Sequence, residues 1–416
     1  MHRKQVPVYF LTNLIKVKGK LSDIVLVVSV QYNRTMSSVQ SLPVLYIKAS
    51  NQFDVGQAVG KTFKGFINDY MSDSKEVKMY RKFFNDPRGK PIVEQYLETS
   101  EKYHPDIMSE IRGIADGSGE SFVDIFMLQL ASEISMCHYD VLFPSEADSH
   151  STPKGCTDVL VNRQSCRVIG HNEDWAFEVS SRVGIVHVTI TGHEETKPME
   201  QFLSYVFPGY LSGLTFGMNK HLVLTLNSLA PTQANVRGVP LQIVVRNLLT
   251  CDSISACVEM MASRPVGCGF GMNINIAEIN TDKMCSVEVY SDKNGSSTDV
   301  HWAHDWVDGF YHHQNHYRRP REDMQAPVVA GSRIRYERVE EMTKEVPVAG
   351  VDDVRTILGD DKSERTPIYL THSEKHSYKD GSTSATAIFD ISNRVLHVYR
   401  ANPRHSLPLA SLPFIT

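Results

Sequence analysis

The chain has 416 residues, a formal net charge of −5 and 41% hydrophobic residues. This composition is typical of a globular protein with a large core. The chain lacks the positive net charge of a nucleic-acid-binding protein and the biased composition of a disordered protein. The apolar run at residues 24–30 is far shorter than the ~18 residues that a membrane-spanning helix needs. We therefore expect neither a nucleic-acid nor a membrane partner.

Residues 1–42 show the least regular sequence pattern in the chain. Lysines precede the apolar run 24–30 in a pattern that imitates a signal peptide, but no small-x-small cleavage site follows it. We expect a poorly structured N-terminal extension, and a targeting segment is the alternative. Ordered sequence is expected to begin at residue 43.

A helical part follows a first strand. Residues 43–49 predict that strand, and apolar spacing predicts helices over 53–71, 92–103, 105–115 and 122–137. Gly56, Gly60 and Gly65 lower helix propensity, so we interpret them as sites of close helix packing and not as a phosphate site. The polar, proline-bounded stretch 144–153 is typical of an exposed linker.

Strands dominate the sequence after this linker. They are predicted over 157–162, 167–169, 183–190, 202–207, 214–218, 222–226, 272–279, 285–290, 383–391 and 395–400. Helices are predicted near 239–249, 254–262 and 332–344. The order of helices, strands, helices and strands favours an α+β fold, in which antiparallel sheets pack against helices, over alternating βαβ units.

The dipeptide Gly155-Cys156 follows the linker directly. If the peptide bond between the two residues breaks, Cys156 becomes an N-terminus that carries both a thiol nucleophile and a base, because a freed α-amine titrates near pH 8. Glycine before the bond permits the strained backbone that an attack of the thiol on the Gly155 carbonyl requires. The alternative is an ordinary buried cysteine.

Two further residues extend this candidate site. Asp174 lies in the motif 170–175, and a hairpin of two short strands would bring it beside Cys156, where a carboxylate could orient the α-amine. Asn273 lies in a glycine-rich entry to a strand, and its amide could stabilise an oxyanion by about 3 kcal/mol. A solvated turn is the alternative for Asp174, and Asn227 is the alternative oxyanion donor.

The other cysteines and the histidines indicate no metal. The chain has seven cysteines, an odd number, without the spacing of a structural zinc site, so we expect no disulfide scaffold and a cytoplasmic protein; secretion is the alternative. Five histidines lie between residues 301 and 316 near Asp305 and Asp308. Their irregular spacing favours packing or substrate contact over a metal site. We predict no metal and no cofactor.

Several motifs together resemble one family. Lys154-Gly-Cys-Thr-Asp158 and Gly170-His-Asn-Glu-Asp174 resemble the self-cleaving N-terminal-nucleophile hydrolases related to acyl-coenzyme A:isopenicillin-N acyltransferase. The resemblance continues at 110–119, 271–278, 312–316, 332–338, 383–390 and 401–403, and so covers residues 43–403. One position departs: Ser384 stands where the penicillin-forming enzyme has arginine, which weakens a transfer of its acyl-CoA chemistry.

The resemblance implies an αββα sandwich formed by residues 43–416 as one folded unit. It also implies cleavage at Gly155-Cys156 into a helical fragment, 43–155, and a catalytic fragment, 156–416, that stay associated as a heterodimer. Whether this heterodimer pairs further is left open. Cys156 is the implied nucleophile, with Asp174 and Asn273 beside it.

The chain most resembles the members of this family that hydrolyse β-alanyl amides of dopamine or histamine and release β-alanine and the amine. The implied partner is therefore a small-molecule amide. Its ammonium group needs an acidic neighbour, for which Glu133, Asp158 and Glu173 are candidates. The candidate substrate-binding residues are Glu133, Asp158, Asn227, Asn315, His316 and Thr383. The alternatives are an acyl-CoA-dependent N-acyltransferase and an inactive binding homologue.

Overall fold

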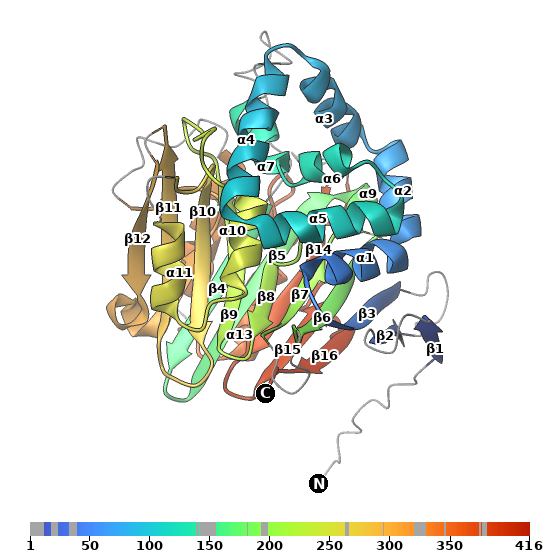
Figure 1. Cartoon of the computed structure of the whole chain (residues 1–416). Coiled ribbons are helices and arrows are strands. Elements are labelled where there is room, and N and C mark those ends of the chain that lie inside the picture. Colours follow the sequence, from blue (N-terminus) through green and yellow to red (C-terminus); the bar gives the residue numbers. More distant parts are fainter. Residues whose placement is uncertain are drawn as a thin grey trace.

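The computed structural model describes residues 12–17, 24–32, 40–138, 141, 155–180, 182–192, 199–262, 266–293, 295–319, 330–344, 347–373, 376 and 381–416. Over these residues two β-sheets pack face to face, and helices cover the outer face of each sheet (Figure 1). The αββα sandwich expected from the sequence is therefore confirmed. The expected linker 144–153 lies outside the described residues.

The larger sheet has ten strands in the order β1-β2-β3-β6-β7-β8-β9-β10-β11-β12. Their bounds are Thr12–Val17, Ile24–Tyr32, Gln40–Ala49, Gly184–Ile190, Glu200–Val206, Phe216–Asn219, Leu222–Leu229, Gly271–Glu278, Met284–Asp292 and Gly295–Trp302. Neighbours are antiparallel except β3 and β6, which are parallel. A strand from the helical part of the chain thus lies inside the sheet, between β2 and β6.

Strands β1 and β2 belong to the segment that we expected to be a poorly structured extension. They pair with each other, and β2 pairs with β3 from Ile24 to Tyr32. Part of residues 1–42 therefore continues the larger sheet at its edge.

The smaller sheet has six antiparallel strands in the order β13-β4-β5-β14-β15-β16. Their bounds are Phe310–His313, Gly155–Arg163, Cys166–Ala176, Gly381–Asp390, Val395–Tyr399 and Ala410–Pro413. Strand β5 is longer than the predicted 167–169, since it continues through the motif at 170–175. Both faces of this sheet are covered, so a strand in it need not show a simple apolar–polar alternation.

Alternation along β4 decides which side chains face the other sheet. Val159 and Val161 belong to the core under the outer helices, whereas Leu160 belongs to the core between the sheets. Because successive side chains in a strand point to opposite faces, Cys156 and Asp158 share the inner face with Leu160.

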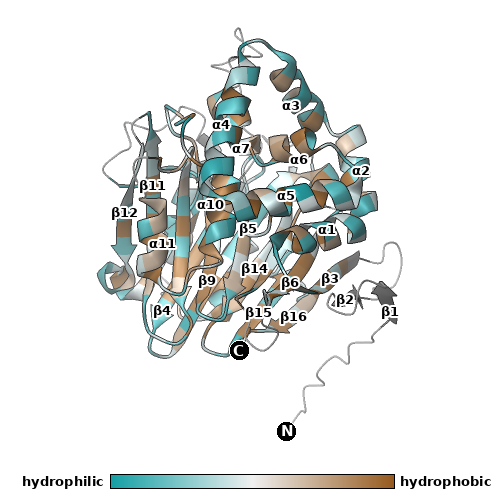
Figure 2. Ribbon diagram, viewed as in Figure 1, coloured by the Kyte–Doolittle hydropathy of each residue, from teal (hydrophilic) through white to brown (hydrophobic). Residues whose placement is uncertain are grey.

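Helices α1–α7 precede the smaller sheet in the chain, and α10 and α11 join them on the larger sheet (Figure 1). Their bounds are Gln52–Thr62, Lys64–Asp73, Lys75–Asn85, Gly89–Tyr103, Pro105–Ser118, Phe122–Leu128, Ala131–Cys137, Leu241–Leu248 and Ile254–Met261. The expected helix 53–71 is divided at Phe63, and the expected helix 122–137 is divided between α6 and α7. Hydrophobic and hydrophilic residues alternate around these helices, as expected for helices that lie on a core (Figure 2).

The close packing expected of Gly56 and Gly60 is confirmed between α1 and α5. A Cβ atom on Gly56 would overlap the carbonyl oxygen of Glu110, and one on Gly60 would lie 2.5 Å from the carbonyl oxygen of Ile114. Gly65 differs, because a Cβ atom there would meet nothing within 4 Å.

Helices α12 and α13, Ala330–Thr343 and Val351–Leu358, cover the smaller sheet, and the short α9, Phe177–Ser180, follows β5. A Cβ atom on Gly170 would overlap Val354, so this glycine permits the close approach of α13 to β5. Across the described residues, none of the helices has the length and apolar character needed to cross a membrane.

Candidate active site

Cys156 is the second residue of β4 and is 6% exposed. Its backbone amide donates a hydrogen bond of 2.7 Å to Oδ1 of Asn315, and its carbonyl oxygen accepts one of 2.5 Å from Arg335. In the register of β4 and β5, Cys156 lies opposite Glu173, and Gly155 lies opposite Asp174. The expected hairpin therefore brings Asp174 beside the Gly155-Cys156 bond.

The thiol of Cys156 donates a hydrogen bond of 3.5 Å to Oε2 of Glu173. Burial raises the pKa of this thiol well above its ordinary value, and the carboxylates of Glu173, Asp158 and Asp174 raise it further against the opposing charge of Arg335. The thiol is therefore protonated at neutral pH, and a base must take its proton before the sulfur can attack a carbonyl.

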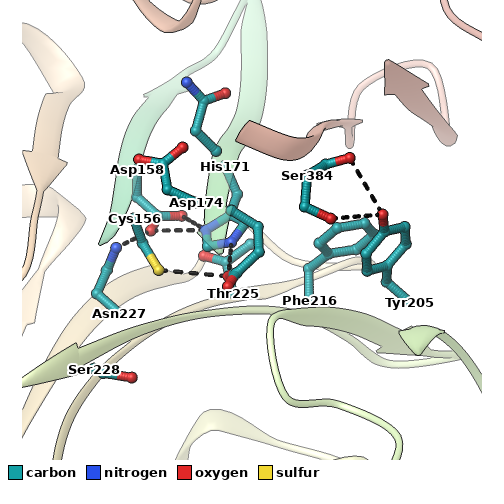
Figure 3. A network of polar contacts seen from close by, with 12 residues as sticks. Cys156, Asp158, His171, Asp174, Tyr205, Phe216, Thr225, Asn227, Ser228 and Ser384 are labelled. Carbon is teal, nitrogen blue, oxygen red and sulfur yellow. Dashed lines mark hydrogen bonds and ion pairs between the residues drawn. The ribbon is translucent and has the colours of Figure 1, made fainter. Parts of the chain in front are cut away.

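His171 lies between two carboxylates in the interior of the sandwich (Figure 3). Its Nδ1 is 3.1 Å from Asp158, and its Nε2 is 3.3 Å from Glu173. Burial alone would lower the pKa of His171, but Asp158 and Glu173 outweigh that effect and raise it to about 10. His171 is therefore an imidazolium at neutral pH, which compensates buried negative charge next to the thiol.

A chain of amides continues this network into the larger sheet. Asn227 on β9 donates a hydrogen bond of 2.5 Å to Asp158, and Asn273 on β10 donates one of 3.0 Å to Asn227. Asn273 also donates to Asn275 and accepts from Ser286. The buried polar groups thus connect the facing surfaces of the two sheets.

This geometry refines the expected role of Asn273. Both hydrogens of its side-chain amide are engaged, one by Asn227 and one by Asn275, each at 3.0 Å. An oxyanion would therefore have to displace one of these acceptors to receive a hydrogen bond from Asn273. The oxyanion role of Asn273 remains a proposal.

Asp174 is held by two residues that come from distant segments. The hydroxyl of Thr383 on β14 donates a hydrogen bond of 2.6 Å to Oδ1 of Asp174, and the guanidinium of Arg335 lies 4.0 Å from Oδ2. Burial raises the pKa of Asp174 to about 6, while Arg335 and Thr383 act in the opposite direction. The carboxyl group therefore titrates close to neutral pH.

Arg335 on α12 is a central residue that sequence reasoning did not single out. Besides the Cys156 carbonyl and Asp174, it contacts Thr157 at 3.0 Å and Asn315 at 2.9 Å. A signal was present in the segment 332–338, which carries three arginines and supported the family resemblance. Nothing in that segment distinguishes the buried Arg335 from the exposed Arg333, apart from the face of the helix on which each lies.

The remaining candidate substrate-binding residues differ in whether they contact Cys156. Asn315 is a direct neighbour of Cys156, whereas His316 accepts or donates a hydrogen bond of 2.7 Å with Ser332 and has a pKa lowered to about 3, chiefly by burial. Glu133 accepts a hydrogen bond of 2.7 Å from the amide of Leu241, at the start of α10. The structure thus gives Glu133 a helix-capping contact with the second half of the chain.

The histidines considered for a metal site have separate partners. His312 contacts Glu340 and His313 contacts Glu288, at 2.7 and 2.9 Å, while the side chain of His304 is 75% exposed. Within the described part of the chain, the group with ligand-like spacing consists of Cys156, His171 and Glu173. The hydrogen bonds among these side chains account for that spacing.

Comparisons with known proteins extend over most of the chain. The family model described as acyl-coenzyme A:6-aminopenicillanic acid acyl-transferase matches residues 161–405. The chain is also 27% identical over 393 residues to the beta-alanyl-dopamine/carcinine hydrolase of Drosophila melanogaster, a similarity that covers 90% of the chain and 97% of the relative. The family match begins at residue 161 and therefore does not include Cys156.

Proposed function

Because the chain belongs to the acyl-coenzyme A:6-aminopenicillanic acid acyl-transferase family, we propose that it is a self-processing cysteine hydrolase of N-β-alanyl amides of biogenic amines. The observation that carries the proposal is the position of Gly155-Cys156. The thiol, a carboxylate opposite each of the two residues and a buried guanidinium all lie at this one peptide bond.

Self-processing would begin with attack of the Cys156 sulfur on the carbonyl carbon of Gly155. The bond between that carbon and the Cys156 nitrogen breaks, the nitrogen gains a proton, and a thioester forms; water then releases residues 1–155 from the thiol. Gly155 suits this step, because a Cβ atom there would lie 3.0 Å from Arg335 and 3.2 Å from Asp174. We further propose that the two fragments remain a heterodimer.

In the mature enzyme the freed amine of Cys156 would serve as the base. The nitrogen already lies 2.7 Å from Oδ1 of Asn315, which also accepts a hydrogen bond from Arg335. The guanidinium disfavours a second positive charge nearby and so opposes the neighbouring carboxylates, which favour the protonated amine. The thiol then attacks the substrate amide, the amine leaves, and water hydrolyses the acyl-thioester.

The acidic side chains at the thiol suit an acyl group that ends in an ammonium. Asp158 is bonded to His171 and Asn227, and Glu133 caps α10, whereas Glu173 contacts the thiol itself. We therefore assign the ammonium to Glu173. Its Oε2 lies 3.5 Å from the attacking sulfur. A β-alanyl group places its ammonium two methylene groups from the carbonyl, a separation that can bridge the sulfur and this carboxylate.

Denaturing gels and N-terminal sequencing test the self-processing. Wild-type protein should give two bands, one beginning at Cys156, whereas Cys156→Ala should give one uncut band. Cys166→Ala, at the far end of the same hairpin, is the matched control and should be cleaved normally. A single band from wild-type protein would reject the proposed mechanism and would favour an inactive binding homologue.

A substrate panel tests the specificity of the cleaved enzyme. β-Alanyldopamine and β-alanylhistamine should be hydrolysed, while N-propionyldopamine, which lacks only the ammonium, should have a kcat/KM at least tenfold lower. Equal activity on both would refute the assignment of Glu173. Transfer of an acyl group from acyl-CoA to an amine, without β-alanyl amide hydrolysis, would establish the acyltransferase alternative.

A further inference from the structure

The uncleaved chain poses a chemical problem that the mature enzyme does not have. Before cleavage, the nitrogen of Cys156 is a peptide amide, which is not a base at neutral pH. Its hydrogen is donated to Asn315 at 2.7 Å. The amine proposed as the base for hydrolysis therefore does not yet exist when the buried, protonated thiol must first react. Another group has to accept the thiol proton.

The group in position is the carboxylate of Glu173. Cys156 and Glu173 are direct partners in the register of β4 and β5, and their side chains lie on the inner face of the smaller sheet. The thiol already donates its hydrogen to Oε2 of Glu173 at 3.5 Å. Of the two other nearby carboxylates, Asp174 accepts from Thr383 and faces Arg335, and Asp158 accepts from Asn227 and contacts His171.

We propose that Glu173 is the catalytic base of self-cleavage, and that it gives up this role to the Cys156 amine once the bond is broken. The inference rests on the proposed self-processing. The thiol proton passes to Oε2 of Glu173 while the sulfur forms a bond to the Gly155 carbonyl carbon. When the carbon–nitrogen bond breaks, Glu173 returns the proton to the leaving nitrogen of Cys156, so the carboxylate is regenerated and no proton is lost.

His171 makes this proton transfer feasible in a buried site. Its ring nitrogen, the sulfur and the Glu173 oxygen all lie within 4.8 Å of one another. Moving the proton from the sulfur to Glu173 shifts one negative charge over this short distance and leaves the net charge unchanged. The imidazolium, held from its other side by Asp158, faces that negative charge before and after the transfer. His171 is therefore a positioning residue.

The first experiment compares rates of self-cleavage in the full-length chain. In Glu173→Gln the amide keeps the shape of the side chain but cannot accept the proton as a carboxylate does, and cleavage should slow by about 10²-fold or more. Glu94→Gln, an exposed change on α4, should leave the rate unaltered. Cleavage of Glu173→Gln within threefold of the wild-type rate would overturn the proposal.

The second measurement separates cleavage from hydrolysis. Cleaved Glu173→Gln protein is collected after prolonged incubation, and its kcat on β-alanyldopamine is measured per cleaved molecule at saturating substrate. The expected kcat is within about threefold of wild type, with a raised KM, because the amine then acts as the base. A kcat reduced by the same factor as the cleavage rate would refute the change of base.

Two further variants distinguish the loss of a catalytic base from misfolding of the chain. Glu173→Asp keeps a carboxylate one methylene group farther away and should still cleave, about tenfold more slowly than wild type; a wild-type rate would contradict the proposal. His171→Gln should lower the cleavage rate and leave kcat of cleaved protein less affected; the reverse pattern would contradict its positioning role.

Failure of the inference is distinguishable from failure of the proposed substrate. If wild type cleaves itself but hydrolyses no β-alanyl amide, the substrate proposal is wrong, and the cleavage rates alone decide the role of Glu173. If wild type never cleaves, self-processing and this inference are both wrong.

Discussion

The hydroxyl of Thr383 donates a hydrogen bond of 2.6 Å to Oδ1 of Asp174, and the same oxygen of Thr383 accepts the backbone amide hydrogen of Leu370 at 2.8 Å. The bond stabilises the charged form of a carboxyl group that burial makes harder to ionise. It joins β14, near the end of the chain, to the β4–β5 hairpin.

Thr383→Val should therefore shift the acidic limb of the pH profile. If ionised Asp174 is needed, kcat/KM rises as pH increases through the pKa of about 6. Removing the hydroxyl raises this pKa, so the acidic limb of the profile should shift to higher pH by up to about one unit. A kcat/KM profile from pH 4.5 to 8.5 measures the shift.

Thr386→Val is the matched control, since Thr386 lies on the same strand but bonds to Asn172. Its acidic limb should coincide with that of wild type. An unchanged limb in Thr383→Val would show that Asp174 does not govern this part of the profile.

Arg335→Lys should reduce both self-cleavage and hydrolysis by about 10²-fold. Lysine keeps the charge but cannot contact the Cys156 carbonyl, Thr157 and Asn315 simultaneously, because its ammonium lacks the planar fork of the guanidinium. Rates of band appearance and kcat provide the two readouts. Arg333→Lys, on the exposed side of the same helix, should be neutral; equal losses in both variants would indicate damage to α12 as a whole.

Gly60→Ala should destabilise the fold, whereas Gly65→Ala should not. The added methyl group at Gly60 meets the backbone of α5, and overpacking of this kind costs about 1–3 kcal/mol. At Gly65 the same change meets open space and should stabilise α2 by about 0.5–1 kcal/mol. Urea denaturation of the uncleaved Cys156→Ala background measures both. A loss of stability at Gly65 comparable to that at Gly60 would argue against the close-packing explanation.

Arg246→Met should weaken the association of the two fragments. Arg246 is buried on α10 and pairs with Glu110 of α5 at 2.9 Å and with Glu200 of β7. Loss of the guanidinium leaves two buried carboxylates uncompensated, at a cost of about 3–5 kcal/mol. Size-exclusion chromatography of the cleaved protein at increasing urea concentrations should show the fragments separating at a lower urea concentration than in wild type.

The triple variant Glu110→Gln, Arg246→Met, Glu200→Gln removes the uncompensated charges and should recover part of this loss. No recovery would indicate that the packing of Arg246 over Phe202, at 4.3 Å from the ring centroid, matters more than its charge.

The sequence predicted the hairpin that joins Cys156 to Asp174, because the two motifs are close in the chain. It did not predict that β5 extends through His171 and Glu173. These polar residues interrupt the apolar pattern of a strand. In the interior, His171 contacts Asp158 and Glu173, and Glu173 also accepts from the thiol. That pairing depends on the register of the folded sheet.

Residues from distant segments were harder to predict. Arg335 reaches the site from a helix whose exposed face is equally rich in charge, so spacing alone does not identify the inward side chain. Thr383 was a candidate from the resemblance, but its bond to Asp174 joins residues that lie far apart in the chain. The parallel pairing of β3 with β6 is equally non-local, since no turn connects these two strands.

That pairing also determines what kind of maturation is possible. Strand β3 lies between β2 and β6 in the larger sheet. If the chain is cleaved as proposed, we therefore expect the N-terminal fragment to stay in the sheet and not to act as an inhibitor that diffuses away. Cleavage at Gly155-Cys156 would then be an irreversible activation step that follows synthesis. The amount of active enzyme would be set by how fast the protein is made and degraded, and release or recapture of a propeptide would have no part in it.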